Sequence, residues 1–353
     1  MTTRYAEAHL PSNLAGPGDA RPTALQIIAD NHLENALGDK VMLVTGCSSG
    51  LGVETVRALA ATGATIYATA RNLEKGRAAL GDLLKPPSAT AGHVELLELD
   101  TADFASVRRC AAAFLARSAR LNVLVNNAGV MAIPQRELTR DGHELQFQTN
   151  HLGHFLLFQL LKPALLAGAA ASPDFRSRVV NVSSQGHRQS RVVFDDLTLG
   201  SPGAYSPFGA YGQSKTANIW MANEIERRYG SPAGGAVHAW SLHPGGITTG
   251  LAVHTDFSAL LAMPEVARGM KSVPQGAATT VLAAVDKELE GKGGLYLDDC
   301  AAAPLVPPDQ ADVFYAPGRA EWAYDGPGAK KLWAVSCRIV GVEDDEGEDR
   351  TEK

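Results

Sequence analysis

Tyr211 and Lys215, four residues apart in the stretch YGQSK, are the side chains of this sequence best suited to move a proton. A free tyrosine hydroxyl has a pKa of about 10, and a nearby ammonium group is expected to lower that pKa by favouring the tyrosinate. Residues four apart share one face of a helix. The pair is either a general acid/base for a carbonyl or alcohol, or part of an amphipathic face that covers a sheet. No other tyrosine of the chain has a lysine four positions later, which favours the chemical interpretation.

A second candidate site is the glycine-rich run TGCSSGLG, residues 45–52. Gly46 permits a tight turn, Gly50 lets the backbone approach a pyrophosphate, and Gly52 lets helix and strand pack closely. An ordinary glycine-rich turn is the alternative. However, an apolar run precedes the glycines and a helix-like segment follows them, which is the context that a phosphate-binding loop requires. The other loop residues expected to line the cofactor are Ser48, Ser49 and Leu51.

The end of the second predicted strand indicates which nicotinamide cofactor is bound. An acid about 20 residues beyond the glycine loop would bind the adenosine ribose of NAD, but the sequence there, IYATARN, has none. Arg71 is suited to bind a 2′-phosphate, so NADP(H) is predicted; an exposed arginine without a ligand is the alternative. Asp100 and Thr101 follow the third strand and are expected at the adenine edge, although Asp100 is equally suited to be a helix N-cap.

Strand-like and helix-like segments alternate along the chain and must position these residues. Apolar runs predict strands at 41–45, 64–70, 94–99, 121–125, 178–183, 236–242 and 294–297. Segments of helical length lie between them, at 51–62, 73–84, 103–118, 138–166, 208–229 and 275–289. This alternation is typical of βαβ crossovers. We therefore expect an α/β fold, a Rossmann-type doubly wound parallel sheet of about seven strands with helices on both faces.

The segments outside this alternation suggest the domain organisation. Residues 185–207 and 247–273 have no clear strand signal, and we expect both over the active-site edge, the second as a substrate lid. The predicted division is an N-terminal arm (1–38), a catalytic NAD(P)-binding domain (39–300), a C-terminal extension packed on that domain (301–342) and a disordered acidic tail (343–353).

The composition excludes several classes of protein. The formal net charge of -6 argues against a nucleic-acid partner, and four widely spaced cysteines predict neither a disulfide framework nor a zinc site. The N-terminus does not resemble a secretory signal, so a cytoplasmic protein is expected. The apolar stretch 155–171 contains Lys162 and is expected to be a buried helix rather than a membrane span. His151 and His154 have no third ligand at a suitable spacing, so no metal is expected.

Five motifs in a fixed order resemble the classical short-chain dehydrogenase/reductase family: TGCSSGLG, NNAG (126–129), NVSS (181–184), YGQSK (211–215) and HPGGITT (243–249). The resemblance runs from about residue 40 to residue 300. The stretches RNLEKG, QTNHLGHFLL and AYGQSKTAN are similar to the retinol-dehydrogenase-like and WW-domain-oxidoreductase-like branch, although the chain has no WW domain. The spacing between NVSS and YGQSK is longer than in most members and resembles an insertion of this branch.

The resemblance implies a role for each catalytic residue. Tyr211 would be the general acid/base, and Lys215 would lower its pKa and bind the nicotinamide ribose. Ser184, rather than Ser183, would hydrogen-bond the substrate oxygen. Asn150 would kink a central helix and link Lys215 through water to bulk solvent. The motifs at the carboxyl ends of two strands would line the cofactor, through Asn127, Ala128, Gly129, Pro244, Gly245, Ile247 and Thr249.

The function implied is that of an NADP(H)-dependent oxidoreductase. It would interconvert a ketone or aldehyde and an alcohol on a lipophilic small molecule, because the lid segment 247–273 offers apolar side chains and no cluster of cations. A non-catalytic NADP-binding scaffold of the same fold is the alternative. Members of the family commonly pair through their central helices, so a homodimer or tetramer is expected through 138–166 and 208–229, unless the extra termini cover that surface.

Overall fold

The computed structural model describes residues 3–85, 92–230, 235–310 and 317–345. Its centre is one eight-stranded sheet in the order β3-β2-β1-β4-β5-β6-β7-β8, parallel except for the last pair. The strands are β1 (Val41–Val44), β2 (Thr65–Ala70), β3 (Val94–Glu98), β4 (Val123–Asn126), β5 (Ser177–Val182), β6 (Val237–Leu242), β7 (Leu295–Asp298) and β8 (Ala301–Ala302). The doubly wound α/β fold is confirmed, with β8 as an antiparallel addition too short to produce a sequence signal.

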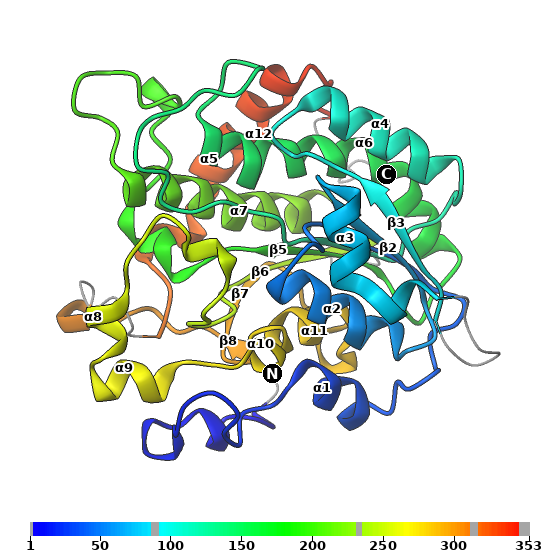
Figure 1. The fold of residues 1–353 in the computed structure, drawn as a ribbon. Helices are drawn as coiled ribbons and strands as arrows, with labels where there is room; N and C mark the ends of the chain where they lie inside the picture. Colours follow the sequence, from blue (N-terminus) through cyan, green and yellow to red (C-terminus); the bar gives the residue numbers. More distant parts are fainter. Residues whose placement is uncertain (1–2, 86–91, 231–234, 311–316, 346–353) are drawn as a thin grey trace.

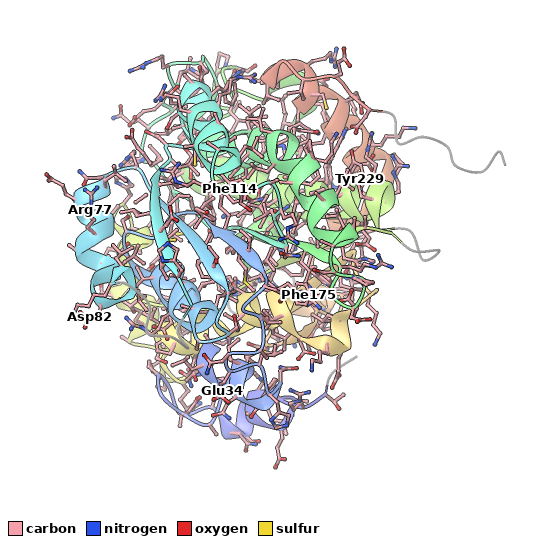
Figure 2. All side chains as sticks on the ribbon, turned by 90° about the vertical axis from the view of Figure 1, so that its right-hand side faces the viewer. Glu34, Arg77, Asp82, Phe114, Phe175 and Tyr229 are labelled. Atoms are coloured by element: carbon pink, nitrogen blue, oxygen red, sulfur yellow. The ribbon has the colours of Figure 1, made fainter. Side chains whose placement is uncertain are left out.

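Helices cover both faces of the sheet (Figure 1). One face carries α1 (Ala24–Asp30), α2 (Gly50–Ala60), α10 (Val273–Gly276) and α11 (Ala278–Val285). The other carries α4 (Phe104–Leu115), α6 (Gly153–Ala170), α7 (Pro207–Tyr229) and α12 (Gly326–Val340), while α3 (Leu73–Leu80) flanks β2 and β3. Alternate side chains of one strand enter different cores: Met42 and Val44 face the α2 side, and Leu43 the α4 side. The same layering is visible in Figure 2, where Phe114 lies inside while Arg77 is at the periphery.

The central helix begins later than the sequence predicts. Residues 138–144 are not helical; the helical run starts at α5 (Leu145–Phe147), where the Glu144 carboxylate accepts hydrogen bonds from the first-turn amides. A π-helical segment, Gln148–Leu152, then leads into α6. The helix 145–170 is long and apolar enough to cross a membrane, but 72% of its most apolar window is buried inside the protein, as expected of a core helix.

The C-terminal segment packs against the central helices. Asp325 caps α12 by accepting a hydrogen bond from the Gly328 amide, and Gly341 ends the helix in the left-handed conformation. The Trp333 ring lies 4.9 Å from that of Phe155, centroid to centroid. α12 therefore covers the surface of α6 and α7 that the sequence analysis assigned to a dimer partner (Figure 1).

Order continues past the point where the acidic tail was expected to begin. Asp344 accepts a hydrogen bond of 2.9 Å from Arg228, and Asp345 pairs with Lys162 and with the Tyr229 hydroxyl. The prediction that the chain is disordered from residue 343 is therefore wrong for residues 343–345, because basic side chains of α6 and α7 neutralise these carboxylates. Residues 346–353 of that tail lie outside the described residues.

The N-terminal arm docks on the α11 side of the sheet. Thr23 caps α1, and the Tyr5 hydroxyl donates a hydrogen bond of 2.8 Å to Asp30. In Figure 1 the dark blue arm lies beside α9 (Pro264–Gly269), part of the segment expected to be the lid. That segment also contains α8 (Ser258–Leu261) and a short turn at Gly250–Ala252. The other irregular region, 185–207, holds two 3-10 turns, Gln185–Gln189 and Phe194–Asp196.

Candidate active site

The tyrosine, lysine and serine singled out from the sequence lie together at the carboxyl edge of β5. Pro207 begins α7 and Ser206 caps it, which places Tyr211 in the second turn and Lys215 in the third. Tyr211 is buried, and its hydroxyl is hydrogen-bonded to that of Ser184. Gly186 is required here: a Cβ at this position would lie 2.8 Å from Cε1 of the Tyr211 ring.

The pKa of Tyr211 is raised in the structure, whereas the sequence analysis expected it to be lowered. Burial raises it to about 12, and the hydrogen bond from Ser184 opposes that shift only in part. Burial also lowers the pKa of Lys215 to about 7. The expectation that the lysine lowers the pKa of the tyrosine is therefore wrong in this structure. The Lys215 Nζ lies 5.5 Å from the ring centroid of Tyr211 and donates its hydrogen bond elsewhere.

Lys215 is anchored to the end of β5. Its Nζ donates a hydrogen bond of 3.0 Å to the carbonyl oxygen of Val182. Within the described residues it has no further hydrogen-bond partner. An ammonium has three donors, so two remain for a ligand. The two serines also separate: the Ser183 hydroxyl donates to the carbonyl oxygen of Lys215 at 2.8 Å, which leaves Ser184 as the serine that faces Tyr211.

Asn150 lies in the π-helical segment of the central helix, where a kink was expected. Its side chain accepts from the Val130 amide at 2.9 Å and donates to the Val130 carbonyl at 3.0 Å and to Ser214 at 2.9 Å. Ser214 in turn donates to the carbonyl oxygen of Tyr211. Asn150 thus ties the central helix to α7 and to the loop after β4. Its link to Lys215 through water stays a prediction.

The glycine loop connects β1 to the N-terminus of α2. Gly46 has φ 76° and Gly50 has φ 60°, conformations that L side chains rarely adopt. A Cβ on Gly52 would lie 2.3 Å from the Gly46 carbonyl oxygen, so only glycine allows this approach. Ser49 precedes the helix and makes no side-chain cap. The first amides of α2 are therefore open to an anion, as a pyrophosphate requires; Ser48 is exposed and Leu51 half-buried beside them.

The residues expected at the adenosine end follow β2 and β3. Arg71 is exposed at the end of β2 and makes no hydrogen bond or ion pair among the described residues, so its guanidinium is available to a phosphate. Asp100 accepts a hydrogen bond from the Ala102 amide at 2.9 Å. The N-cap of α4 is Asp103, so the alternative role of Asp100 as N-cap is wrong. Thr101 is buried against Gly153 of the central helix, whose Cβ would lie 2.2 Å from the Thr101 carbonyl oxygen.

A hydroxyl that the sequence analysis did not single out organises the loop after β4. Thr45 Oγ1 accepts hydrogen bonds of 2.9 Å from the amides of Asn127 and Ala128 and is itself 2.9 Å from His154 Nε2. His154 Nδ1 lies 2.9 Å from the Asn150 carbonyl, to which it must donate, so Nε2 accepts the Thr45 proton. Burial lowers the pKa of His154 to about 4 and keeps it neutral.

The adjacent Gly129 approaches Lys215 and Asn150: a Cβ there would lie 3.5 Å from the lysine Nζ and 3.1 Å from the asparagine Oδ1. The loop after β6 completes this edge. Thr249 lies against the glycine loop, since a Cβ on Gly50 would lie 3.5 Å from its Cγ2. Ile247 pairs with Lys271 in a short parallel bridge.

These residues fit a dinucleotide. Every loop described lies at the carboxyl edge of the sheet, around the point where the strand order reverses between β1 and β4. Open helix amides at one end and two unused lysine donors at the other match a pyrophosphate and a ribose. The histidines considered for a metal are used otherwise: His151 contacts Ser336, and His154 contacts Thr45.

Comparison with known proteins agrees with this geometry. A family model described as short chain dehydrogenase matches residues 40–256. The chain is 51% identical over 342 residues to the short-chain dehydrogenase/reductase prx1 of Penicillium roqueforti, covering 96% of this chain and 95% of that protein. It is 39% identical to a WW domain-containing oxidoreductase of Danio rerio, covering 91% and 72%, and 35% identical to human retinol dehydrogenase 12, covering 87% and 88%. These relatives confirm the resemblance to the retinol-dehydrogenase-like branch.

Solved structures share the fold. An uncharacterized protein from Mycobacterium paratuberculosis is similar with a TM-score of 0.63 and 33% identity, over 93% of this chain and 99% of that one. A short chain dehydrogenase from Shigella flexneri complexed with NADP has a TM-score of 0.55 and 23% identity, over 75% and 99%. At that identity the second likeness shows the fold alone.

Proposed function

Since this chain belongs to the short-chain dehydrogenase/reductase family of oxidoreductases, which use nicotinamide cofactors, we propose that it is an NADP(H)-dependent carbonyl reductase or alcohol dehydrogenase. The observation that carries the proposal is the buried cluster of Tyr211, Ser184 and Lys215 beside an open glycine loop. We assign its action to the cytoplasm, as the sequence suggests.

The cofactor preference rests on Arg71. An exposed guanidinium at the end of β2, with no acid beside it in the sequence, favours a ribose that carries a 2′-phosphate. The glycine loop would receive the pyrophosphate at the N-terminus of α2, Asp100 and Thr101 would border the adenine, and Asn127 to Gly129 would line the adenosine side. The loop from Pro244 to Thr249 would border the nicotinamide.

In the proposed reaction, the cofactor supplies or accepts the hydride and the chain handles the proton. Ser184 donates a hydrogen bond to the substrate oxygen as negative charge develops on it. Tyr211 stays protonated at neutral pH, because burial raises its pKa to about 12, and gives its proton to that oxygen during carbonyl reduction. The two free donors of Lys215 hold the ribose hydroxyls, and Asn150 fixes α7 to the loop after β4.

The substrate proposed is lipophilic. The lid presents apolar side chains at Leu251, Val253 and Met263, and Phe257 of the lid contacts Phe208 in the first turn of α7, three residues before Tyr211. No excess of cations accompanies them in the lid sequence, which argues against a polyanionic substrate.

The test is oxidation of NADPH, and in parallel of NADH, by the purified protein with a panel of aldehydes and ketones, followed at the absorbance of the reduced nicotinamide. Turnover of at least one apolar carbonyl that is lost in Tyr211→Phe supports the proposal. Binding of NADPH without turnover of any carbonyl or alcohol would support the scaffold alternative instead.

A further inference from the structure

A buried lysine outside the catalytic cluster holds the loop after β6. Lys271 lies near the end of the lid segment, and its side chain is enclosed although it is charged. Its Nζ lies 2.7 Å from Asp299 Oδ1 and donates to the carbonyl oxygen of Pro244 at 3.4 Å. A Cβ on Gly245, which has φ 105°, would lie 2.7 Å from the lysine Cδ, so the stem of Lys271 fills the space beside that glycine. The backbone amide of Lys271 also donates to the Gly246 carbonyl at 2.8 Å.

The partner carboxylate is presented by a strained turn. Asp299 and Cys300 connect β7 to β8 and have φ 50° and φ 60°, values that non-glycine residues rarely adopt. The Thr279 hydroxyl accepts a hydrogen bond of 3.2 Å from the Cys300 amide and so holds the turn. Local strain of this kind persists where the surroundings fix it, and it often accompanies a functional contact.

The N-terminal arm packs beside the ion pair. His9 Nε2 lies 3.7 Å from Asp299 Oδ1, and the buried Arg21 guanidinium donates to the carbonyl oxygens of Gly269 and Met270, the two residues before Lys271. Gln275 binds the arm from the other side through Asp19. The arm thereby covers the Lys271 end of the pair, whereas the Asp299 side chain keeps 36% of its surface exposed.

We propose that Lys271, held by Asp299 and enclosed by the N-terminal arm, is a positioning residue that fixes the loop from Pro244 to Thr249 for the nicotinamide end of the cofactor. This inference rests on the proposed function, in which that loop borders the nicotinamide. It assigns a cofactor-related task to the arm, which lies outside the part of the chain that the family model matches.

The test compares two ligands that differ only at the nicotinamide end. Affinities for NADPH and for 2′-phospho-ADP-ribose, which lacks only the nicotinamide ring, are measured by calorimetry for wild type and Lys271→Met. Loss of an oriented loop should weaken NADPH about tenfold while the fragment changes less than about twofold. The matched control is Lys85→Met, since Lys85 is also 2.7 Å from an aspartate carboxylate but is exposed and far along the chain. It should change neither affinity.

A second variant guards against misfolding, because Lys271→Met leaves Asp299 without its cation. The double variant Lys271→Met/Asp299→Asn removes both charges and should show the same selective loss. Equal weakening of both ligands, or an unchanged NADPH affinity in the double variant, overturns the inference. Wild type that binds neither ligand overturns the proposed function together with it, so the two failures are distinguishable.

Discussion

The Nζ atom of Lys215 lies 3.0 Å from the carbonyl oxygen of Val182, so this lysine is anchored to the end of β5 and not to the hydroxyl of Tyr211. The two side chains share a helical face, but each has its own partner: Val182 for the lysine and Ser184 for the tyrosine. This arrangement holds the lysine in place without consuming all of its donors.

The first prediction concerns the charge of that lysine. Burial lowers the pKa of Lys215 to about 7 in the folded protein, whereas an unfolded chain keeps the proton to about pH 10.4. Between these values the unfolded chain binds more protons, so the contribution of Lys215 to stability rises with pH, by up to about 1.4 kcal/mol per pH unit. Urea unfolding of wild type and Lys215→Met from about pH 7 to about pH 9 measures the free energy of unfolding of each protein. We expect the value for wild type minus the value for the variant to rise with pH. A difference that falls or stays level contradicts it.

Removal of the tyrosine hydroxyl should separate binding from chemistry. Tyr211→Phe keeps the buried ring against Gly186 but has no proton to give, so we expect turnover to fall by about 10²–10⁴ with little change in NADPH affinity. Steady-state kinetics and calorimetry provide the two numbers. Ser183→Ala serves as a control, because Ser183 bonds the backbone of Lys215 and does not face the tyrosine. Near-normal turnover of Tyr211→Phe would remove the tyrosine from the mechanism.

Arg71→Ala should weaken NADPH about ten- to a hundredfold while leaving NADH nearly unchanged, because only NADPH carries the 2′-phosphate. Arg77→Ala is the matched control: Arg77 is an exposed arginine of α3, six residues further along, at the periphery in Figure 2. Binding measured by calorimetry with both cofactors tests the prediction. Equal losses for the two cofactors would place the 2′-phosphate elsewhere.

Thr45 is predicted to hold the loop after β4. Thr45→Val leaves the Ala128 amide without its acceptor and removes one of the two acceptors of the Asn127 amide, so we expect about 1–3 kcal/mol less stability and weaker cofactor binding. Thr45→Ser keeps the hydroxyl and should retain most of both. Chemical unfolding of the two variants measures the difference, and equal stabilities would mean that the hydroxyl is dispensable.

The C-terminal helix is predicted to be part of the catalytic domain and to keep it monomeric. Trp333→Ala should cost about 3–5 kcal/mol of stability, because the indole is buried against Phe155 and Phe158.

Removal of residues 346–353 should leave the melting temperature unchanged. Light scattering of wild type should give one chain per particle, and a dimer would contradict the covering role of α12.

Much of this molecule follows from local sequence patterns. Continuous apolar runs predict seven of the strands, and the motifs that end them predict which loops meet at the carboxyl edge. These features depend on a few neighbouring residues. The pKa of Tyr211 could not be predicted from the sequence. It depends on how deeply α7 is buried and on where the Lys215 ammonium points, and neither is encoded in the spacing of the pair.

The contacts that sequence reasoning missed join distant parts of the chain. Lys271 and Asp299 meet only because the end of the lid crosses the β7–β8 turn, and His154 reaches Thr45 from another element. His154 carried a signal, since it stands one turn after Asn150, but the sequence analysis considered it only as a metal ligand, a role that it did not favour. The sequence predicts a solvated tail at Asp344 and Asp345, because the cations that pair with these carboxylates are not near them in the sequence but lie on α6 and α7.

The position of α12 after α6 and α7 in the sequence has a consequence for biosynthesis. A ribosome makes about 5–20 residues per second from the amino end, so α6 and α7 leave it before α12 exists. Until α12 has been made, the apolar surface that Trp333 later covers faces water in the nascent chain, a state that favours aggregation and chaperone binding. α12 therefore completes the core around the helix that carries Tyr211 only after that helix has already been made.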